Sequence, residues 1–113
     1  MLSGERTGIG VFGAGYVGLV TAACFAELGR SVVLHDVDAA KLATLRAGGL
    51  PIHEPGLLEL VERGVRTGRL RFAADPAEAV AGMGAVFVAV GTPPAADGRA
   101  DLSAVRAAAR TIA

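Results

Sequence analysis

Short apolar runs alternate along the chain with longer segments in which apolar and polar positions are mixed. The runs at residues 8–12, 31–35, 70–73 and 85–90 have the length of strands, and several are rich in β-branched residues. The mixed segments predict helices at residues 38–47 and 57–63, a helix start at residues 75–78, and a last helix that opens at Asp101. A longer and more apolar segment, residues 16–28, predicts a further helix. Strands that alternate with helices predict a parallel sheet covered by helices.

Some of these elements carry finer expectations. Residues 16–28 are apolar on nearly every side, so this helix is expected to be largely buried and to end at Gly29. Residues 75–78 supply a cap acceptor, a proline at the first helical position and an acid at the third, which together predict a well-defined helix start. The run at residues 85–90 is the most continuous apolar segment, which is typical of a central parallel strand.

The composition limits the chain to one domain in which helices lie close to a sheet. Its 113 residues are 52% hydrophobic but only 4% aromatic, and 16 are glycine, so the core must be built from aliphatic side chains packed against backbone. The 11 basic and 11 acidic residues balance and form no basic run, which argues against a nucleic-acid or polybasic membrane surface. Neither a secretory signal nor a membrane span is recognisable, so a cytoplasmic protein is expected.

The segment from Gly13 to Gly18 has the spacing G-x-G-x-x-G and lies between the first predicted strand and the first predicted helix. Gly13 permits a tight turn, Gly15 lets the backbone approach a pyrophosphate, and Gly18 lets the helix lie close to the strand. The free N–H groups and the positive dipole end of that helix would face the phosphates. This context favours a dinucleotide-binding loop over glycines that serve turn and packing alone.

Asp36 follows the second predicted strand, about 20 residues beyond the glycine loop, where a carboxylate can accept both hydroxyls of an adenosine ribose. An aspartate at a strand-to-helix junction can also cap the helix, and the two roles can coexist. Because a carboxylate repels a 2′-phosphate, and Val37 rather than an arginine follows, NAD is predicted in preference to NADP. Lys41 lies one turn into the next helix and either reaches the adenosine or stays in solvent.

A third candidate segment, Val90-Gly91-Thr92-Pro93-Pro94, follows the fourth predicted strand. In a sheet with strand order 3-2-1-4, this strand end lies beside the glycine loop, at the switch point where ligands bind. Thr92 can then offer a hydroxyl to the nicotinamide half of the cofactor, and Val90, Gly91 and Pro93 are candidate cofactor-binding residues beside it. The alternative is a rigid surface loop made by the two prolines.

Other reactive side chains lack the partners that would make a catalytic or metal site. Cys24 lies in the helix that is expected to be buried, where a thiol acts as a small hydrophobic group, and a single cysteine excludes a disulfide framework. His35 ends a strand with no evident partner, and His53 lies in a proline-containing loop without a second ligand at metal spacing. Neither a catalytic group nor a metal is therefore expected.

Several blocks of residues, in order, resemble the nucleotide-sugar dehydrogenases, the UDP-glucose/GDP-mannose dehydrogenase family, over nearly the whole chain. The blocks are the glycine loop continued by Leu19 and Val20, and residues 24–29, 51–57, 91–94 and 97–103. The resemblance implies a Rossmann-like α/β fold, a parallel sheet of about four strands in the order 3-2-1-4 with helices on both faces.

The resemblance also implies an NAD-dependent enzyme that oxidises the C6 hydroxyl of UDP-glucose to the carboxylate of UDP-glucuronate, for polysaccharide biosynthesis, with two NAD⁺ in succession. Carried onto the matching positions, the resemblance implies that Tyr16 and Val17 lie along the cofactor and that Asp36 and Lys41 contact the adenosine ribose. Thr92 would then lie near the ribose of the nicotinamide half.

The family's catalytic cysteine and UDP-binding domain lie downstream of the segments matched here, and Cys24 does not match the motif of that cysteine. Residues 1–113 are therefore expected to be an N-terminal NAD-binding domain that is C-terminally incomplete and inactive alone. In this incomplete domain the apolar strand at residues 86–90 would have an uncovered edge, which predicts that the chain self-associates. The full-length enzyme would be a homo-oligomer that acts on a nucleotide sugar. A GDP-mannose or UDP-N-acetylmannosamine dehydrogenase and a nucleotide-binding module without catalysis are alternatives.

Overall fold

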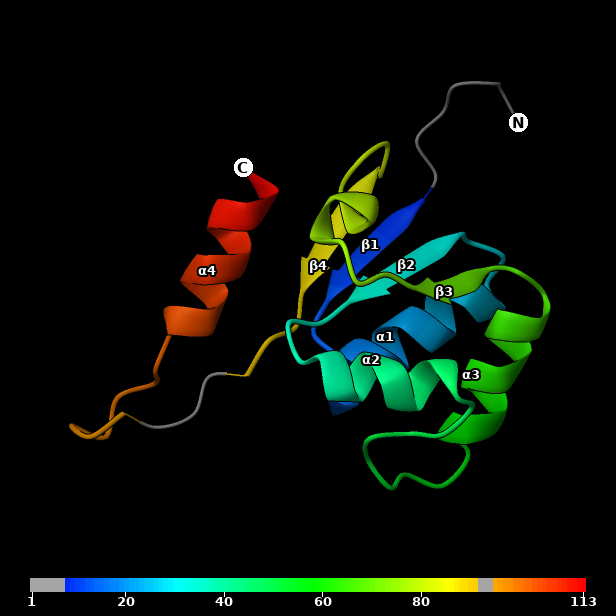
Figure 1. Ribbon diagram of the computed structural model, residues 1–113, viewed down its shortest axis with the longest axis horizontal. Helices are drawn as coiled ribbons and strands as arrows, with labels where there is room; N and C mark the ends of the chain where they lie inside the picture. Colours follow the sequence, from blue (N-terminus) through cyan, green and yellow to red (C-terminus); the bar gives the residue numbers. More distant parts are fainter. Residues whose placement is uncertain (1–7, 92–94) are drawn as a thin grey trace.

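A computed structural model describes residues 8–91 and 95–113 of the chain. The strands form one four-stranded sheet in the order β3-β2-β1-β4 (Figure 1). They are β1 (Ile9–Phe12), β2 (Val32–His35), β3 (Leu70–Phe72) and β4 (Ala85–Val88). Neighbouring strands run parallel throughout. The predicted α/β fold and the predicted strand order are confirmed.

Helices lie on both faces of this sheet, as predicted. They are α1 (Tyr16–Glu27), α2 (Ala39–Arg46), α3 (Leu57–Arg66), the short 3-10 helix η1 (Pro76–Ala79) and α4 (Ser103–Ile112). On one face, α1, α2 and α3 enclose aliphatic side chains that include Val11, Leu34 and Leu70. Helices η1 and α4 lie on the other face (Figure 1). There they enclose a smaller cluster that includes Phe12 and Val33. Side chains alternate between the faces because successive strand residues point to opposite sides.

Helix α1 is buried on one side only. Its buried residues are Gly18, Leu19, Ala22, Ala23 and Ala26, whereas Tyr16 and Val17 are 52% and 62% exposed and Cys24 is also exposed. The prediction of a largely buried helix was therefore wrong, and so was the interpretation of Cys24 as a buried hydrophobic group. Apolar residues on all sides of a helix do not bury it when only one side meets the sheet and α3.

The cap at residues 75–78 forms, but it starts a single 3-10 turn and not a longer helix. The Asp75 carboxylate accepts the N–H of Ala77 at 2.9 Å, and η1 ends at Ala79. This turn lies directly on β1, because a Cβ at Gly10 would overlap the carbonyl oxygen of Ala79. The chain then turns at Gly82, with φ of +73°, to reach β4.

Strand β4 is shorter than predicted and lies at the edge of the described sheet. The centre is taken by β1, which pairs with β2 on one side and with β4 on the other. Phe87 and Val88 of β4 remain exposed, although the Phe87 ring centroid lies 5.3 Å from that of Phe25 on α1. The continuous apolar run thus indicated the strand correctly, and in the described residues this strand takes the exposed edge position that the order 3-2-1-4 predicts and not a central one.

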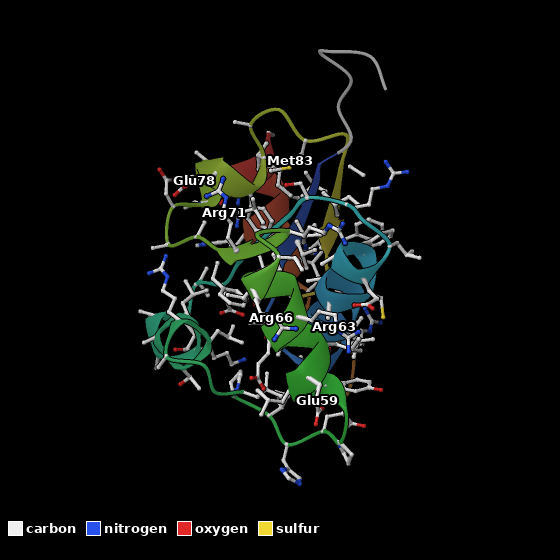
Figure 2. The ribbon with its side chains drawn as sticks, turned by 90° about the vertical axis from the view of Figure 1, so that its right-hand side faces the viewer. Glu59, Arg63, Arg66, Arg71, Glu78 and Met83 are labelled. Carbon is white, nitrogen blue, oxygen red and sulfur yellow. The ribbon has the colours of Figure 1, made fainter. Side chains whose placement is uncertain are left out.

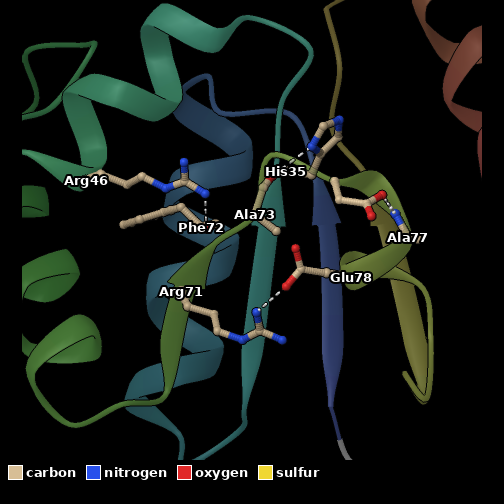
Figure 3. A network of polar contacts seen from close by, with 8 residues as sticks. His35, Arg46, Arg71, Phe72, Ala73, Ala77 and Glu78 are labelled. Atoms are coloured by element: carbon tan, nitrogen blue, oxygen red, sulfur yellow. Dashed lines mark hydrogen bonds and ion pairs between the residues drawn. The ribbon is translucent and has the colours of Figure 1, made fainter.

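Polar contacts on the surface tie the elements together. Arg63 of α3, labelled in Figure 2, contacts Glu27 of α1 at 2.6 Å. Arg71 of β3 contacts Glu78 of η1 at 2.8 Å (Figure 3). Both ion pairs are exposed, so each contributes roughly 0–1 kcal/mol to stability. Arg46 of α2 also donates to the carbonyl oxygen of Phe72 at 2.9 Å.

The last described helix, α4, begins beside an acidic side chain. Asp101 accepts the N–H of Ser103 at 2.9 Å, and its hydrogen bonds with Ser103 hold the pKa of this carboxyl below its ordinary value. Among the residues described, no helix has the length and apolar character needed to cross a membrane.

Candidate functional site

The carboxyl ends of β1, β2 and β4 meet at one edge of the sheet, and the glycine loop lies across them. The N–H of Gly13 donates to the carbonyl oxygen of His35 at 2.8 Å, and the N–H of Ala89 donates to that of Phe12 at 2.7 Å. Backbone hydrogen bonds therefore hold the loop against the strands on either side of it. Open α/β sheets bind ligands at this kind of edge, where the strand order reverses.

Two glycines of the loop are required by the backbone itself. Gly13 has φ of +116°, and a Cβ added there would lie 2.5 Å from the carbonyl oxygen of Ala89. A Cβ at Gly18 would overlap the carbonyl oxygen of Gly13, so α1 can approach the loop this closely only without a side chain. These are the tight turn and the close helix packing that the glycine spacing predicts.

The middle glycine faces open space. A Cβ at Gly15 would have no heavy atom within 4 Å, unlike one at either of the other two glycines. Helix α1 makes its first hydrogen bond from Leu19 N–H to Gly15 carbonyl oxygen at 2.9 Å, so the N–H groups of residues 16–18 precede the helical ladder. The first turn carries no acidic residue. The positive end of this helix can therefore receive an anion beside Gly15.

Asp36 links this loop to the end of β2. Its Oδ2 accepts the N–H of Ala14 at 2.7 Å, and its Oδ1 accepts the N–H of Asp38 at 2.8 Å. An ionised carboxylate can accept about four hydrogen bonds, so each oxygen retains capacity for another donor. The half-buried carboxylate is thereby held at the loop in one orientation, ready to accept hydroxyl groups.

The cap of α2 belongs to a different aspartate from the one that the sequence suggested. Asp38 accepts the N–H groups of Ala40 and Lys41 at 2.9 and 3.4 Å, so the helix-capping alternative for Asp36 is wrong. Lys41 lies in the first turn of α2 and is partly buried. The two aspartates have separate tasks although a single residue, Val37, lies between them.

A cavity of about 170 Å³ opens beside Asp36, on the sheet face covered by α4. Its lining is mostly apolar and combines strand ends, η1 and α4: Phe12, Gly13, His35, Asp36, Val37, Pro76, Val90, Ala104, Ala107, Ala108 and Thr111. Val90 is therefore brought to the site, whereas Gly91 is exposed and Thr92 and Pro93 lie outside the described residues. The cavity has the apolar walls and few polar groups that suit a planar heterocycle.

His35 is a site residue that sequence reasoning missed. It is only 5% exposed, and its Nδ1 lies 2.9 Å from the carbonyl oxygen of Ala73 (Figure 3). Its ring also meets that of Phe12 edge-on, with centroids 5.4 Å apart. The expectation that His35 has no partner was wrong, because the partner lies 38 residues away and is brought near only when β3 pairs with β2.

The part of the chain that the structure describes holds no group of three or more His, Cys, Asp or Glu able to bind a metal ion. His53 is exposed. What converges at the sheet edge is a helix N-terminus, an oriented carboxylate and an apolar cavity. Together these groups can bind a phosphate, a diol and a heterocycle in sequence.

Comparison with known proteins also indicates a dinucleotide-binding domain. Residues 7–113 match the model of the UDP-glucose/GDP-mannose dehydrogenase family, NAD binding domain. The chain is 49% identical over 104 residues to UDP-glucose 6-dehydrogenase TuaD of Bacillus subtilis, which covers 92% of this chain and 23% of that protein. The chain thus spans about a quarter of the length of such relatives.

Solved structures show the same likeness. A UDP-glucose dehydrogenase from Pyrobaculum islandicum matches with a TM-score of 0.90 at 50% identity, over 97% of this chain and 26% of that one. A GDP-mannose dehydrogenase from Pseudomonas aeruginosa matches with a TM-score of 0.87 at 39% identity, over 92% of this chain and 24% of that one. Sequence and fold therefore agree on the relatives of this chain.

Proposed function

The chain belongs to the UDP-glucose/GDP-mannose dehydrogenase family, whose NAD-binding domain it matches, and from this premise we propose that it binds NAD⁺ across the edge formed by β1, β2 and β4. The observation that carries the proposal is the contact between the glycine loop and Asp36, in which Oδ2 accepts the N–H of Ala14 at 2.7 Å. It holds the glycine loop next to the Asp36 carboxylate, so that one dinucleotide could reach both.

The pyrophosphate would lie over Gly15, at the start of α1. Support comes from the open space on the Cβ side of Gly15 and from the N–H groups of residues 16–18 that precede the helical ladder. Gly13 and Gly18 would hold the loop in the shape that admits the phosphates, and the exposed side chains of Tyr16 and Val17 would flank the cofactor. The helix dipole adds a favourable term for this anion.

The adenosine would lie at the end of β2. Asp36 would accept the ribose hydroxyls with the lone pairs that its two backbone bonds leave free, and Lys41 would approach the same ribose from α2. The adenine would enter the apolar cavity between Val37, Val90 and α4. The 2′-phosphate of NADP⁺ would be repelled by the Asp36 carboxylate. The neighbouring Val37, which is 94% exposed, is uncharged and offers no compensating positive charge, so we propose NAD⁺ and not NADP⁺ as the coenzyme.

The nicotinamide half would continue from Val90 and Gly91 toward Thr92 and Pro93. Support comes from Val90, which lines the cavity and follows the end of β4. In this proposal Thr92 supplies a hydroxyl to the ribose of that half. NAD⁺ supplies hydride-transfer chemistry when bound, and the residues of this chain hold and orient it.

For the whole protein we propose a UDP-glucose 6-dehydrogenase that forms UDP-glucuronate with two NAD⁺. Support comes from the relatives named UDP-glucose dehydrogenase at 49% and 50% identity, against 39% for the GDP-mannose dehydrogenase. The chain would be the N-terminal coenzyme-binding part of a cytoplasmic homo-oligomer, and the groups that react with the sugar would come from other segments. A GDP-mannose dehydrogenase is the alternative within the family.

Isothermal titration of the 113-residue chain with NAD⁺ and NADP⁺ tests the coenzyme site. NAD⁺ is expected to bind, and to bind more tightly than NADP⁺, while no NADH forms when UDP-glucose is added to the chain alone. Absence of NAD⁺ binding by a folded chain would refute the proposed site. Tighter binding of NADP⁺ would refute the role of Asp36.

A further inference from the structure

The cavity beside Asp36 contains a polar atom whose hydrogen-bonding character the structure defines. We propose that Nε2 of His35 accepts a hydrogen bond from the 6-amino group of adenine and so selects this base. This inference rests on the proposed NAD⁺ site and adds a specificity-determining residue to it. His35 would act on the choice of dinucleotide and would take no part in hydride transfer.

The tautomer of His35 follows from its partner. The Nδ1 atom lies 2.9 Å from the carbonyl oxygen of Ala73, and a carbonyl oxygen can only accept a hydrogen bond. The ring hydrogen must therefore be on Nδ1, where it donates to Ala73. In a neutral imidazole with this tautomer, Nε2 has a lone pair and no hydrogen, so it can only accept.

His35 lines the cavity although the residue as a whole is buried. Among the described residues, no buried side-chain nitrogen or oxygen lacks a hydrogen-bond partner, and the partner of His35 is on Nδ1. Within the described residues Nδ1 is the ring atom that has a protein partner, and His35 lines the cavity, so Nε2 is the atom that we assign to the ligand. Figure 3 shows this second ring nitrogen on the side of the imidazole away from Ala73.

The ring is held in place before any ligand arrives. The bond to Ala73 fixes one edge of the imidazole, and the Phe12 ring packs against it at an interplanar angle of 68°. Both contacts come from residues at strand ends or next to one, so the acceptor has a defined direction. A preorganised acceptor discriminates between ligands because it cannot turn away from a mismatched group.

Few other side chains in the cavity can identify a base. Asp36 already accepts two backbone N–H groups and would bind the ribose. Thr111 donates its hydroxyl to the carbonyl oxygen of Ala107 at 3.0 Å, which leaves its oxygen as an acceptor. The remaining lining side chains are apolar, so His35 and Thr111 are the two candidates that an experiment must separate.

Adenine presents an amino donor at position 6, whereas hypoxanthine presents an oxo acceptor at the same position. Two acceptors face each other when hypoxanthine meets Nε2, and the hydrogen bond is lost. One such bond changes affinity roughly 3- to 10-fold. The wild-type chain should therefore bind NAD⁺ more tightly than nicotinamide hypoxanthine dinucleotide by about that factor.

The test is calorimetric binding of both dinucleotides to the wild-type chain, to His35→Asn and to Thr111→Val. An asparagine amide can donate to Ala73 in place of Nδ1, but it has no atom at the position of Nε2. The preference for NAD⁺ should fall toward unity in His35→Asn and persist in Thr111→Val. If Thr111→Val loses the preference instead, Thr111 identifies the base and the proposal is overturned.

A measurement on the unaltered chain covers the case in which His35→Asn does not fold. In long-range ¹H–¹⁵N spectra, the Nε2 resonance of His35 should shift on addition of NAD⁺, and less on addition of the hypoxanthine dinucleotide. Equal shifts, or equal affinities of the wild type for both dinucleotides, refute the role of His35 while the NAD⁺ site stands. Absence of NAD⁺ binding refutes the proposed function itself, so the two failures are distinguishable.

Discussion

Replacing Asp36 by alanine, with Asp38→Ala as its control, separates ribose binding from helix capping. Each aspartate accepts two backbone N–H groups at 2.7–3.4 Å, those of Ala14 and Asp38 in one case and those of Ala40 and Lys41 in the other. The two substitutions therefore remove similar numbers of bonds from adjacent turns. Only Asp36 touches the glycine loop, so only its loss should affect the dinucleotide.

The expected magnitudes follow from these contacts. Hydrogen bonds to a charged group contribute about 1.5–3 kcal/mol each, and partial hydration of the freed N–H groups lowers this, so Asp36→Ala should cost about 2–4 kcal/mol of stability. Asp38→Ala removes an exposed helix cap and should cost about 1 kcal/mol. Loss of two ribose hydroxyl bonds to Asp36 should weaken NAD⁺ binding roughly 10- to 100-fold, whereas Asp38→Ala should leave it within about 2-fold.

Urea unfolding followed by circular dichroism gives the free energies of unfolding. Calorimetric titration without urea, at a temperature where each variant is folded, gives the affinities for NAD⁺. Asp36→Ala should also narrow the gap between NAD⁺ and NADP⁺, because the carboxylate that repels a 2′-phosphate is gone. If Asp36→Ala binds NAD⁺ as tightly as Asp38→Ala does, the ribose assignment is refuted. If the two variants unfold at the same urea concentration, the bond between Asp36 and the loop contributes little to the free energy of unfolding.

Two further outcomes follow from the same structure. Gly18→Ala should unfold the chain or destabilise it severely, because its Cβ would overlap a carbonyl oxygen of the loop. Gly15→Ala should melt at nearly the wild-type temperature and bind NAD⁺ more weakly, because its Cβ points into open space. Equal effects of the two substitutions on the melting temperature would contradict the steric argument. Cys24 should react with Ellman's reagent in the native chain at a rate near that of the unfolded chain, since it is exposed; protection in the native chain would contradict the orientation of α1.

Much of the fold could be predicted from local sequence because each element carries its own pattern. Short β-branched runs, amphipathic segments and glycines at helix ends are decided by neighbouring residues, and alternating strands and helices restrict the sheet to a few parallel orders. The order β3-β2-β1-β4 and the helices on both faces were predicted from the Rossmann-like fold that the resemblance implies, and the structure has both. The glycine loop was also predictable, because its turn and its close helix packing depend on residues within one short segment.

What the tertiary structure decided concerns contacts between distant residues and the side of an element that meets a neighbour. The pattern of α1 was apolar on every side, and only its packing on the sheet and α3 shows that Cys24 faces solvent. The helix start at Asp75 gives a single turn, whose last residue, Ala79, lies directly against Gly10 of β1. Both outcomes depend on which surfaces come together, which no local pattern encodes.

The candidate site divides in the same way. The sequence alone identified the glycine loop and predicted that Asp36 binds the ribose and that NAD⁺ is preferred, because strand, loop and carboxylate follow one another at a known spacing. The bond from Ala14 to Asp36, the transfer of the helix cap to Asp38 and the bond from His35 to Ala73 required the folded chain. The two long-range bonds join residues that are 22 and 38 positions apart in the chain, and they form only after the strands have paired. No local sequence pattern therefore identifies their donors and acceptors.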